Sequence, residues 1–209
     1  MPSLKTDNSY LRYDLRIIAS WIAPSSKVIG LGCGGGELLY YLKRHKGIKE
    51  TGIEISEEKV AQCIEKGLSV IQGDILEEVD DYPDKTFDYV ILSQTLQQVY
   101  DPVAVISAML RIGKKGIVTF PNFGYWRIRS QLLLSGRAPV SSQLPYQWYD
   151  TPNIRVLTIQ DFRDFSRKAG FKILREIAIN THNEDRSGKI VRFFPNLFGT
   201  YGIFLISKS

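Results

Sequence analysis

The sequence predicts an α/β protein built on a doubly wound, mostly parallel seven-stranded sheet with an antiparallel last strand. Two observations predict this fold. Short apolar segments alternate with helical segments along most of the chain, a pattern typical of parallel strands joined by crossover helices. Two further apolar segments then follow one another with no helical period between them, as is usual for antiparallel neighbours.

Strands are expected where short apolar runs end at glycine or at polar residues. The run over residues 87–92 is almost continuously apolar, which is typical of a central strand buried on both faces. The expected strands cover residues 27–31, 51–55, 68–72, 87–92, 116–120, 171–179 and 201–206.

Helices are expected where apolar residues recur at helical spacing between start and stop signals. Pro102 stands in the first turn of one of them, where its missing N–H costs little. Thr158 and Asp161 resemble a capping box for the last, with Asp in place of the usual Glu. The expected helices cover residues 11–22, 37–45, 57–66, 101–111, 125–134 and 158–169.

Composition limits the class of protein. With 209 residues, 44% of them hydrophobic and 23% charged, the chain matches one soluble globular domain. No stretch approaches the roughly 18 apolar residues of a membrane span, and the polar start does not resemble a signal peptide. Cys33 and Cys63 are too few for a disulfide framework. We therefore expect a cytoplasmic protein with no membrane partner.

The positive charge belongs to the second half of the chain. Residues 1–100 hold 11 Lys and Arg against 15 Asp and Glu, whereas residues 101–209 hold 16 against 7. The basic residues are scattered, without a run of five, so they predict a solvated basic face. No nucleic-acid partner is expected.

A glycine-rich loop follows the first expected strand and leads into a helix. The loop contains Gly32, Cys33, Gly34 and Gly36, and it offers backbone N–H groups at the carboxyl edge of the sheet, where open α/β folds bind ligands. Glycine lets the backbone approach a ligand and adopt positive φ. A tight turn without binding is the alternative interpretation.

Carboxylates end the next two strands. Glu54 lies 22 residues after Gly32, near the spacing at which a carboxylate accepts hydrogen bonds from ribose hydroxyls. Asp74 could accept the exocyclic amine of an adenine, or it could cap a helix. With Ile55 and Ile75, which follow them, these residues predict an adenosine pocket.

Which adenosine ligand the loop predicts depends on which of its glycines are matched to a known binding pattern. Gly30, Gly32 and Gly35 also satisfy the dinucleotide pattern G-x-G-x-x-G, but that frame places Gly30 inside the strand. A dinucleotide also needs a second nucleotide-binding half, and the chain has no phosphate-binding loop of the G-x-x-x-x-G-K-[ST] type. We favour a single adenosyl ligand, with a nicotinamide-dependent oxidoreductase as the weaker alternative.

Together these features resemble class I S-adenosylmethionine-dependent methyltransferases across almost the whole chain. Four segments more narrowly resemble the MetW family of methionine biosynthesis proteins, the last being the most specific. They are Asp-Leu-Arg at 14–16, Leu-Ser-Gln-Thr-Leu-Gln at 92–97, Phe-Pro-Asn-Phe-Gly at 120–124 and Leu-Pro-Tyr-Gln-Trp-Tyr-Asp-Thr-Pro-Asn at 144–153.

The resemblance implies a single class I methyltransferase-like, Rossmann-like domain over residues 1–209, with 124–157 as an inserted helix and aromatic connector. It implies S-adenosylmethionine, or S-adenosylhomocysteine, as the ligand. It also implies a role in methionine biosynthesis with a homoserine O-acyltransferase partner. Whether the protein methylates a small-molecule acceptor stays open.

Two carboxylates of the resembled pattern are missing. Gly30 stands where the superfamily usually carries an acidic residue, and Gly35 stands where the related proteins carry Asp. Loss of a charge-assisted hydrogen bond to the methionyl amine costs roughly 1.5–3 kcal/mol, so we expect weakened cofactor affinity.

Few residues are candidates for acid–base chemistry. His45, His182 and Cys33 have simpler interpretations as surface or packing residues, and with Cys63 they lack metal-ligand spacing. Ser93 and Gln94 follow the fourth strand, where the resemblance places groups that line the cofactor and acceptor.

An aromatic string in the second half of the chain is the other candidate site. Tyr146, Trp148 and Tyr149 are candidates for a partner surface or an acceptor lid, with local packing as the alternative.

Overall fold

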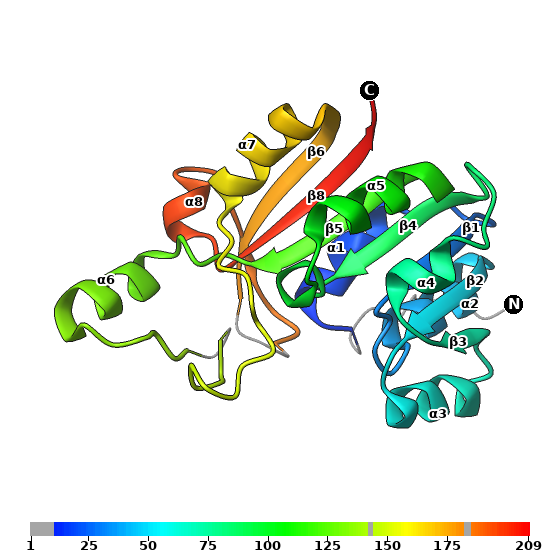
Figure 1. Ribbon diagram of the computed structural model, residues 1–209, viewed down its shortest axis with the longest axis horizontal. Helices are drawn as coiled ribbons and strands as arrows, with labels where there is room; N and C mark the ends of the chain where they lie inside the picture. Colours follow the sequence, from blue (N-terminus) through cyan, green and yellow to red (C-terminus); the bar gives the residue numbers. More distant parts are fainter. Residues whose placement is uncertain (1–10, 142–143, 182–184) are drawn as a thin grey trace, which may run out of the picture.

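A computed structural model defines residues 11–141, 144–181 and 185–209. Eight strands form one sheet in the order β3-β2-β1-β4-β5-β8-β6-β7 (Figure 1). The strands are β1 (Lys27–Leu31), β2 (Lys49–Glu54), β3 (Val70–Gln72), β4 (Phe87–Ser93), β5 (Gly113–Pro121), β6 (Phe171–Asn180), β7 (Lys189–Val191) and β8 (Tyr201–Lys208). The helices are α1 (Tyr13–Trp21), α2 (Glu37–Lys46), α3 (Glu57–Glu65), α4 (Ile75–Val79), η2 (Leu96–Gln98), α5 (Pro102–Ile112), α6 (Trp126–Ser135), α7 (Ile159–Ala169) and α8 (Pro195–Phe198).

The order of the strands reverses between β1 and β4. β1 pairs in parallel with β2 and β2 with β3, whereas β4 pairs in parallel with β5 on the other side. β8 runs antiparallel to both β5 and β6, which confirms the expected antiparallel last strand. The loops that follow β1 and β4 therefore diverge at the carboxyl edge, which is the usual ligand site of such sheets.

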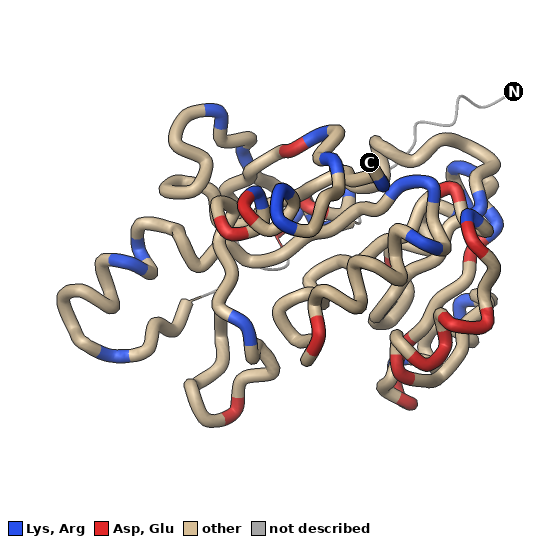
Figure 2. Tube along the Cα trace, turned by 45° about the horizontal axis from the view of Figure 1, so that its top comes forward, with Lys and Arg blue, Asp and Glu red and all other residues tan. Residues whose placement is uncertain are grey.

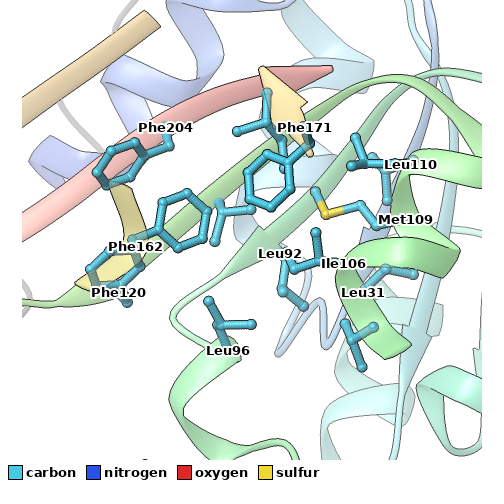
Figure 3. Close-up of a cluster of buried hydrophobic side chains, with 14 of the residues drawn as sticks. Leu31, Leu92, Leu96, Ile106, Met109, Leu110, Phe120, Phe162, Phe171 and Phe204 are labelled. Atoms are coloured by element: carbon cyan, nitrogen blue, oxygen red, sulfur yellow. The ribbon is translucent and has the colours of Figure 1, made fainter. Parts of the chain in front are cut away.

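Helices cover both faces of the sheet, and each face has its own apolar cluster. One cluster joins α4, α5 and α7 to the sheet, and the other joins α1, α2 and α3 to it. In the first, the rings of Phe120, Phe171 and Phe204 gather around Phe162, and Phe171 lies next to Met109 (Figure 3). Because side chains alternate between faces, β1 and β4 are apolar at nearly every position, as the sequence indicated.

The sheet has one strand more than the seven that the sequence predicts. The additional strand, β7, lies in the segment between β6 and β8 where no regular element is expected, and α8 lies there too. β7 has three residues at the sheet edge, too few for periodicity to reveal. The polar residues after β3 likewise form the short helix α4.

One buried amide joins three elements. Asn122 follows β5 and is 1% exposed. Its Nδ2 donates hydrogen bonds to the carbonyls of Asn196 (3.1 Å) and Gly199 (2.8 Å) at α8. Its Oδ1 accepts from the N–H groups of Gly124 (3.0 Å) and of Ile159 (3.2 Å) at the start of α7. This side chain fixes where the chain leaves β5.

Across the three described stretches of the chain, no helix has both the length and the apolar character needed to cross a bilayer.

Candidate functional site

The glycine loop joins β1 to α2 at the carboxyl edge. Gly32, Gly34 and Gly36 all have positive φ, of 65°, 60° and 79°. The N–H groups of Gly32 and Cys33 both donate to the carbonyl of Ile53 in β2, at 2.9 and 3.0 Å. The loop is therefore anchored to the neighbouring strand, and the N–H of Gly36 closes it internally on the carbonyl of Cys33 at 3.2 Å.

The space around these glycines differs. A β-carbon at Gly36 would lie 2.4 Å from Leu68 Cδ1, and one at Gly32 would lie 2.8 Å from Thr95 Oγ1. A β-carbon at Gly34 would meet nothing within 4 Å. The backbone is thus packed at both ends of the loop and open at its centre, as binding of a ligand against the loop requires.

Glu54 lies beside the loop, as its spacing predicts. Its side chain ends β2 and is 6% exposed. Oε2 accepts a hydrogen bond from the N–H of Gly34 at 2.8 Å, and Oε1 accepts one from the N–H of Ser56 at 3.1 Å. The next side chain, Ile55, is 70% exposed, so an apolar surface lies next to the carboxylate.

Asp74 caps a helix. Its Oδ1 accepts a hydrogen bond from the N–H of Leu76 at 2.8 Å, at the start of α4. The N-cap that the sequence offered as an alternative is therefore present, and contact with an adenine stays a prediction. Ile75 is half-buried against the core cluster.

The last residue of β4, Ser93, and the residue that follows it, Gln94, lie on the other side of the glycine loop at this edge of the sheet. Ser93 Oγ lies 3.3 Å from Thr119 Oγ1 in β5. Gln94 has a positive φ of 53°, which is rare for a residue other than glycine. Its Nε2 donates a hydrogen bond to Asp14 Oδ2 at 2.8 Å. The strained turn thus directs the Gln94 amide toward α1.

Asp14 is a further candidate at this edge, and the sequence had not singled it out as a site residue. Its carboxylate is 3% exposed and forms an ion pair with Arg12 at 3.1 Å. The sequence does carry a signal, because Asp14 falls at helical spacing from Leu11 and Ile18 on the buried face of α1. A charged residue on an apolar face is rare without a partner or a role.

Tyr201 is a second candidate that the sequence had not indicated. Its ring begins β8, is 1% exposed, and its hydroxyl is among the few buried polar atoms of the described residues that lack a hydrogen-bond partner. Burial raises the pKa of Tyr201, and the charge of Asp14 raises it further. An unpaired buried hydroxyl is costly, so this group is a candidate for contact with a bound molecule.

The cysteines are packed rather than activated. Cys33 Sγ lies 4.0 Å from Cys63 Sγ, and Cys63 Sγ donates to the carbonyl of Gly34 at 3.2 Å. Burial, followed by the neighbouring Cys63, raises the pKa of the Cys33 thiol, which opposes thiolate formation at the helix N-terminus. Packing is therefore the better interpretation of Cys33.

Of the two histidines, His45 lies away from the glycine loop, at the other end of α2. The His45 ring lies against Tyr41 in the last turn of α2, with ring centroids 4.4 Å apart. His182 lies outside the described residues. Among those residues no three His, Cys, Asp or Glu side chains gather closely enough to hold a metal ion.

Gly30 and Gly35, where the resembled pattern has carboxylates, differ in how much room a side chain would have. A β-carbon at Gly30 would lie 3.1 Å from Cys33 Cβ and 3.3 Å from Leu39 Cδ1, between the strand and α2. One at Gly35 would meet only the ends of the Gln62 and Glu37 side chains. A side chain is thus harder to place at Gly30 than at Gly35.

The aromatic string lies on the surface. Trp148 and Tyr149 are 75% and 71% exposed, and their rings meet edge to face at 5.6 Å. Tyr146 is 47% exposed. The chain then returns to the edge, where the N–H of Arg155 donates to the carbonyl of Gln97 in η2 at 3.0 Å. Local packing, the alternative interpretation, does not bury these rings.

An adenosyl ligand fits this arrangement. The loop is open at Gly34, Glu54 would supply an acceptor for ribose hydroxyls, and Ile55 would offer an apolar surface for a base. S-adenosylmethionine supplies an electrophilic methyl group when bound. In-line transfer of that group needs orientation more than acid–base help.

Comparison with known proteins agrees with the geometry. A model of the family described as "Methionine biosynthesis protein MetW" matches residues 12–206. The chain is 35% identical over 185 residues to the bifunctional methionine biosynthesis protein MetXA/MetW of Rhodopirellula baltica. The aligned region covers 84% of this chain and 30% of that protein. The chain therefore spans less than a third of the length of this relative.

Solved structures share the fold. A possible histamine N-methyltransferase from Thermotoga maritima, an S-adenosylmethionine-dependent methyltransferase, has a TM-score of 0.67 and 20% identity over 98% of this chain and 91% of that one. The [4+2]-cyclase SpnF has a TM-score of 0.64 and 20% identity over 93% of this chain and 80% of that one. The chain thus has the class I methyltransferase-like fold, but that fold by itself does not specify methyl transfer.

Proposed function

The chain belongs to the MetW family of methionine biosynthesis proteins, and we propose that it is an S-adenosylmethionine-binding, methyltransferase-like protein that works with a homoserine O-acyltransferase. The observation that carries ligand binding is the pairing of Glu54 with Gly34 across the carboxyl edge. It joins a ribose acceptor to the open centre of the loop, at the point where the strand order reverses.

The partner is supported by the relative from Rhodopirellula baltica, whose description combines MetXA and MetW in one bifunctional protein. Fusion holds two activities at a high effective concentration, which is useful when the separate proteins act together. We therefore propose the acyltransferase as the partner of this chain.

A second candidate function is methyl transfer to a small molecule. Asp14, Gln94 and Tyr201 favour it, since a buried carboxylate, the amide of a residue with positive φ and a buried unpaired hydroxyl come from segments around the same edge. Tyr201→Phe removes only the unpaired hydroxyl, so it should keep the fold. If the protein is active, S-adenosylhomocysteine accumulates in the presence of a small-molecule cell extract, and Tyr201→Phe lowers its rate.

Two measurements test the main proposal. Calorimetry on the purified protein should detect binding of S-adenosylmethionine and S-adenosylhomocysteine, and no comparable binding of NAD. Co-purification from the native host with a tag on this chain should retain the homoserine O-acyltransferase. Binding of NAD in preference to both adenosyl ligands would overturn the ligand, and absence of the acyltransferase at native expression levels would overturn the partner.

A further inference from the structure

Helix α6 and the connector that follows it are held to the rest of the chain by a small apolar cluster. We call residues 126–141 and 144–156 the arm. Among the described residues, the cluster beneath the arm consists of Tyr125, Ile128 and Leu144, with Phe123 partly buried against it. In Figure 1, α6 projects away from the sheet. Most of the arm therefore has no neighbour among the described residues that buries its side chains.

The arm nevertheless carries large apolar side chains. Leu132, Leu133 and Leu134 are 54%, 84% and 84% exposed, and the exposed rings of Trp148 and Tyr149 belong to the same arm. Exposed leucines are ordinary when single, but a group of them with aromatic rings is typical of an interaction site. Aromatic side chains are also the most frequent energetic anchors of protein interfaces.

The direction of the leucines indicates what kind of surface covers them. Successive residues of an α-helix are about 100° apart, so three in a row span about 200° of its circumference. A lid that closes on an acceptor buries one face only. Side chains spread this widely require a groove that receives the end of the helix from several sides.

The charges of the arm are mostly positive. Arg127, Arg129, Arg137 and Arg155 accompany a single acidic residue, Asp150, and Figure 2 shows the basic segments spread along this part of the chain. Arg127 lies over the ring of Trp126, with 5.4 Å between its Cζ and the ring centroid. A complementary surface is therefore an apolar groove with acidic residues at its rim.

We propose that the arm is the docking surface for the homoserine O-acyltransferase, received in an apolar, acidic-rimmed groove of that enzyme. This inference rests on the proposed function, which supplies the partner. It assigns the glycine loop to the adenosyl ligand and the arm to the acyltransferase, so one can be weakened without the other.

The test compares exposed apolar residues on and off the arm. Leu133→Asp and Leu134→Asp each place a charge on the arm. Ile64→Asp places the same charge on α3, where Ile64 is 61% exposed, and serves as the matched control. For each full-length variant, calorimetry measures binding of the purified acyltransferase and, separately, of S-adenosylmethionine. Light scattering measures the mass of the protein alone.

We expect at least tenfold weaker acyltransferase binding for both arm variants, with S-adenosylmethionine binding within twofold of wild type. Ile64→Asp should change neither. Unchanged acyltransferase binding in the arm variants would overturn the docking surface alone, whereas a wild-type protein that does not bind the acyltransferase would overturn the proposed partner as well.

Three further outcomes would also overturn the assignment. Loss of S-adenosylmethionine binding with the acyltransferase retained would make the arm a lid. A wild-type dimer that becomes monomeric in Leu134→Asp would make it a contact between two copies of this chain. Arm-dependent sedimentation with anionic phospholipid vesicles, in place of acyltransferase binding, would make it a membrane contact.

Discussion

The carboxylate of Glu54 has two structural partners before any ligand arrives. Its oxygens accept hydrogen bonds from the backbone N–H groups of Gly34 and Ser56, which lie on opposite sides of it in the chain. Hydrogen bonds to a charged group contribute about 1.5–3 kcal/mol each. The same residue therefore orders the loop and presents an acceptor, and its two roles must be separated by experiment.

Glu54→Ala should weaken binding of S-adenosylmethionine by roughly 2–3 kcal/mol, because a charge-assisted hydrogen bond to the ribose is lost. Glu54→Gln is the matched control, since it keeps the shape and one acceptor oxygen, and it should lie between wild type and Glu54→Ala. Calorimetry gives the affinities, and urea unfolding checks the fold. Equal affinity in a folded Glu54→Ala protein would remove Glu54 from the binding site.

The buried thiols make stability depend on alkaline pH. The pKa values of Cys33 and Cys63 are both raised in the folded protein, mainly by burial, whereas an unfolded thiol titrates near 8.5. The contribution of the two protonated thiols to the free energy of unfolding is fully present below pH about 8.5. Above it the unfolded chain loses protons that the folded chain keeps, so the free energy of unfolding falls as pH rises, by up to about 1.4 kcal/mol per pH unit for each thiol.

Urea unfolding from pH 7 to 10 should therefore show a shallower decline in the double variant Cys33→Ala, Cys63→Ala than in the wild-type protein. The comparison uses the change with pH and not the absolute stability, because removal of two packed side chains lowers stability at every pH. Parallel curves for the two proteins would mean that the thiols titrate normally in the folded state.

At the scale of elements, local signals and tertiary contacts agree in some places and diverge in others. The capping box of α7 forms with Asp in the third position, and both of its reciprocal hydrogen bonds are present. Helix α2, in contrast, begins at Glu37, and its N-cap residue Gly36 provides no side-chain cap. Its first turn is the end of the glycine loop, so the loop geometry, and not capping, decides where α2 begins.

Gly34→Ala and Gly36→Ala should separate binding from stability within this loop. Both add a β-carbon at positive φ, which costs about 1–2 kcal/mol. Gly36→Ala also places a methyl group against Leu68 and Cys63, at 2.4 and 2.8 Å, so it should cost about 1–3 kcal/mol more. Gly34→Ala has free space but narrows the approach to the backbone, so we expect the larger relative loss of S-adenosylmethionine affinity there.

Urea unfolding and calorimetry on both loop variants make this comparison. If Gly34→Ala binds as tightly as wild type, the ligand does not approach the centre of the loop. If Gly36→Ala is as stable as Gly34→Ala, then Leu68 and Cys63 move aside and the loop is less tightly packed than its geometry indicates.

The two halves of the chain differ both in charge and in the direction of their strands. The acidic residues concentrate in the first half of the chain, around α3 and α4, and the basic residues in the second (Figure 2). The second half adds β8, which is antiparallel to β5, and β6, which is antiparallel to β8, and Asn122 links the end of β5 to α7 and α8. Residues 120–124, which resemble the MetW family, thus form the link between β5 and the elements that follow it.

Asn122→Ala should lower the free energy of unfolding by about 3 kcal/mol or more. The change leaves the N–H groups of Gly124 and Ile159 without their acceptor, and each buried polar group without a partner costs about 1–3 kcal/mol. Thr119→Val, in which another buried polar side chain of the same region becomes apolar, is a suitable comparison and should cost less. A loss below 1 kcal/mol in urea unfolding would show that water replaces the amide.

The sequence by itself determined the alternation of strands and helices, the glycine loop and the approach of Glu54 to it. These features depend on local periodicity and on short spacings within one strand–loop–helix unit, so neighbouring residues encode them. It also predicted the antiparallel end of the sheet, because two strands without a crossover helix have few other ways to pair.

The tertiary structure alone decided which distant groups meet. Asp14 and Gln94 are 80 positions apart and share a hydrogen bond, and Tyr201 comes from the other end of the chain. The additional strand β7 and the helix α8 are too short to produce a period, and they form because β6 and Asn122 offer them hydrogen bonds. The packing of β1, β4 and β8 in space creates these contacts, and no pattern along the chain specifies them.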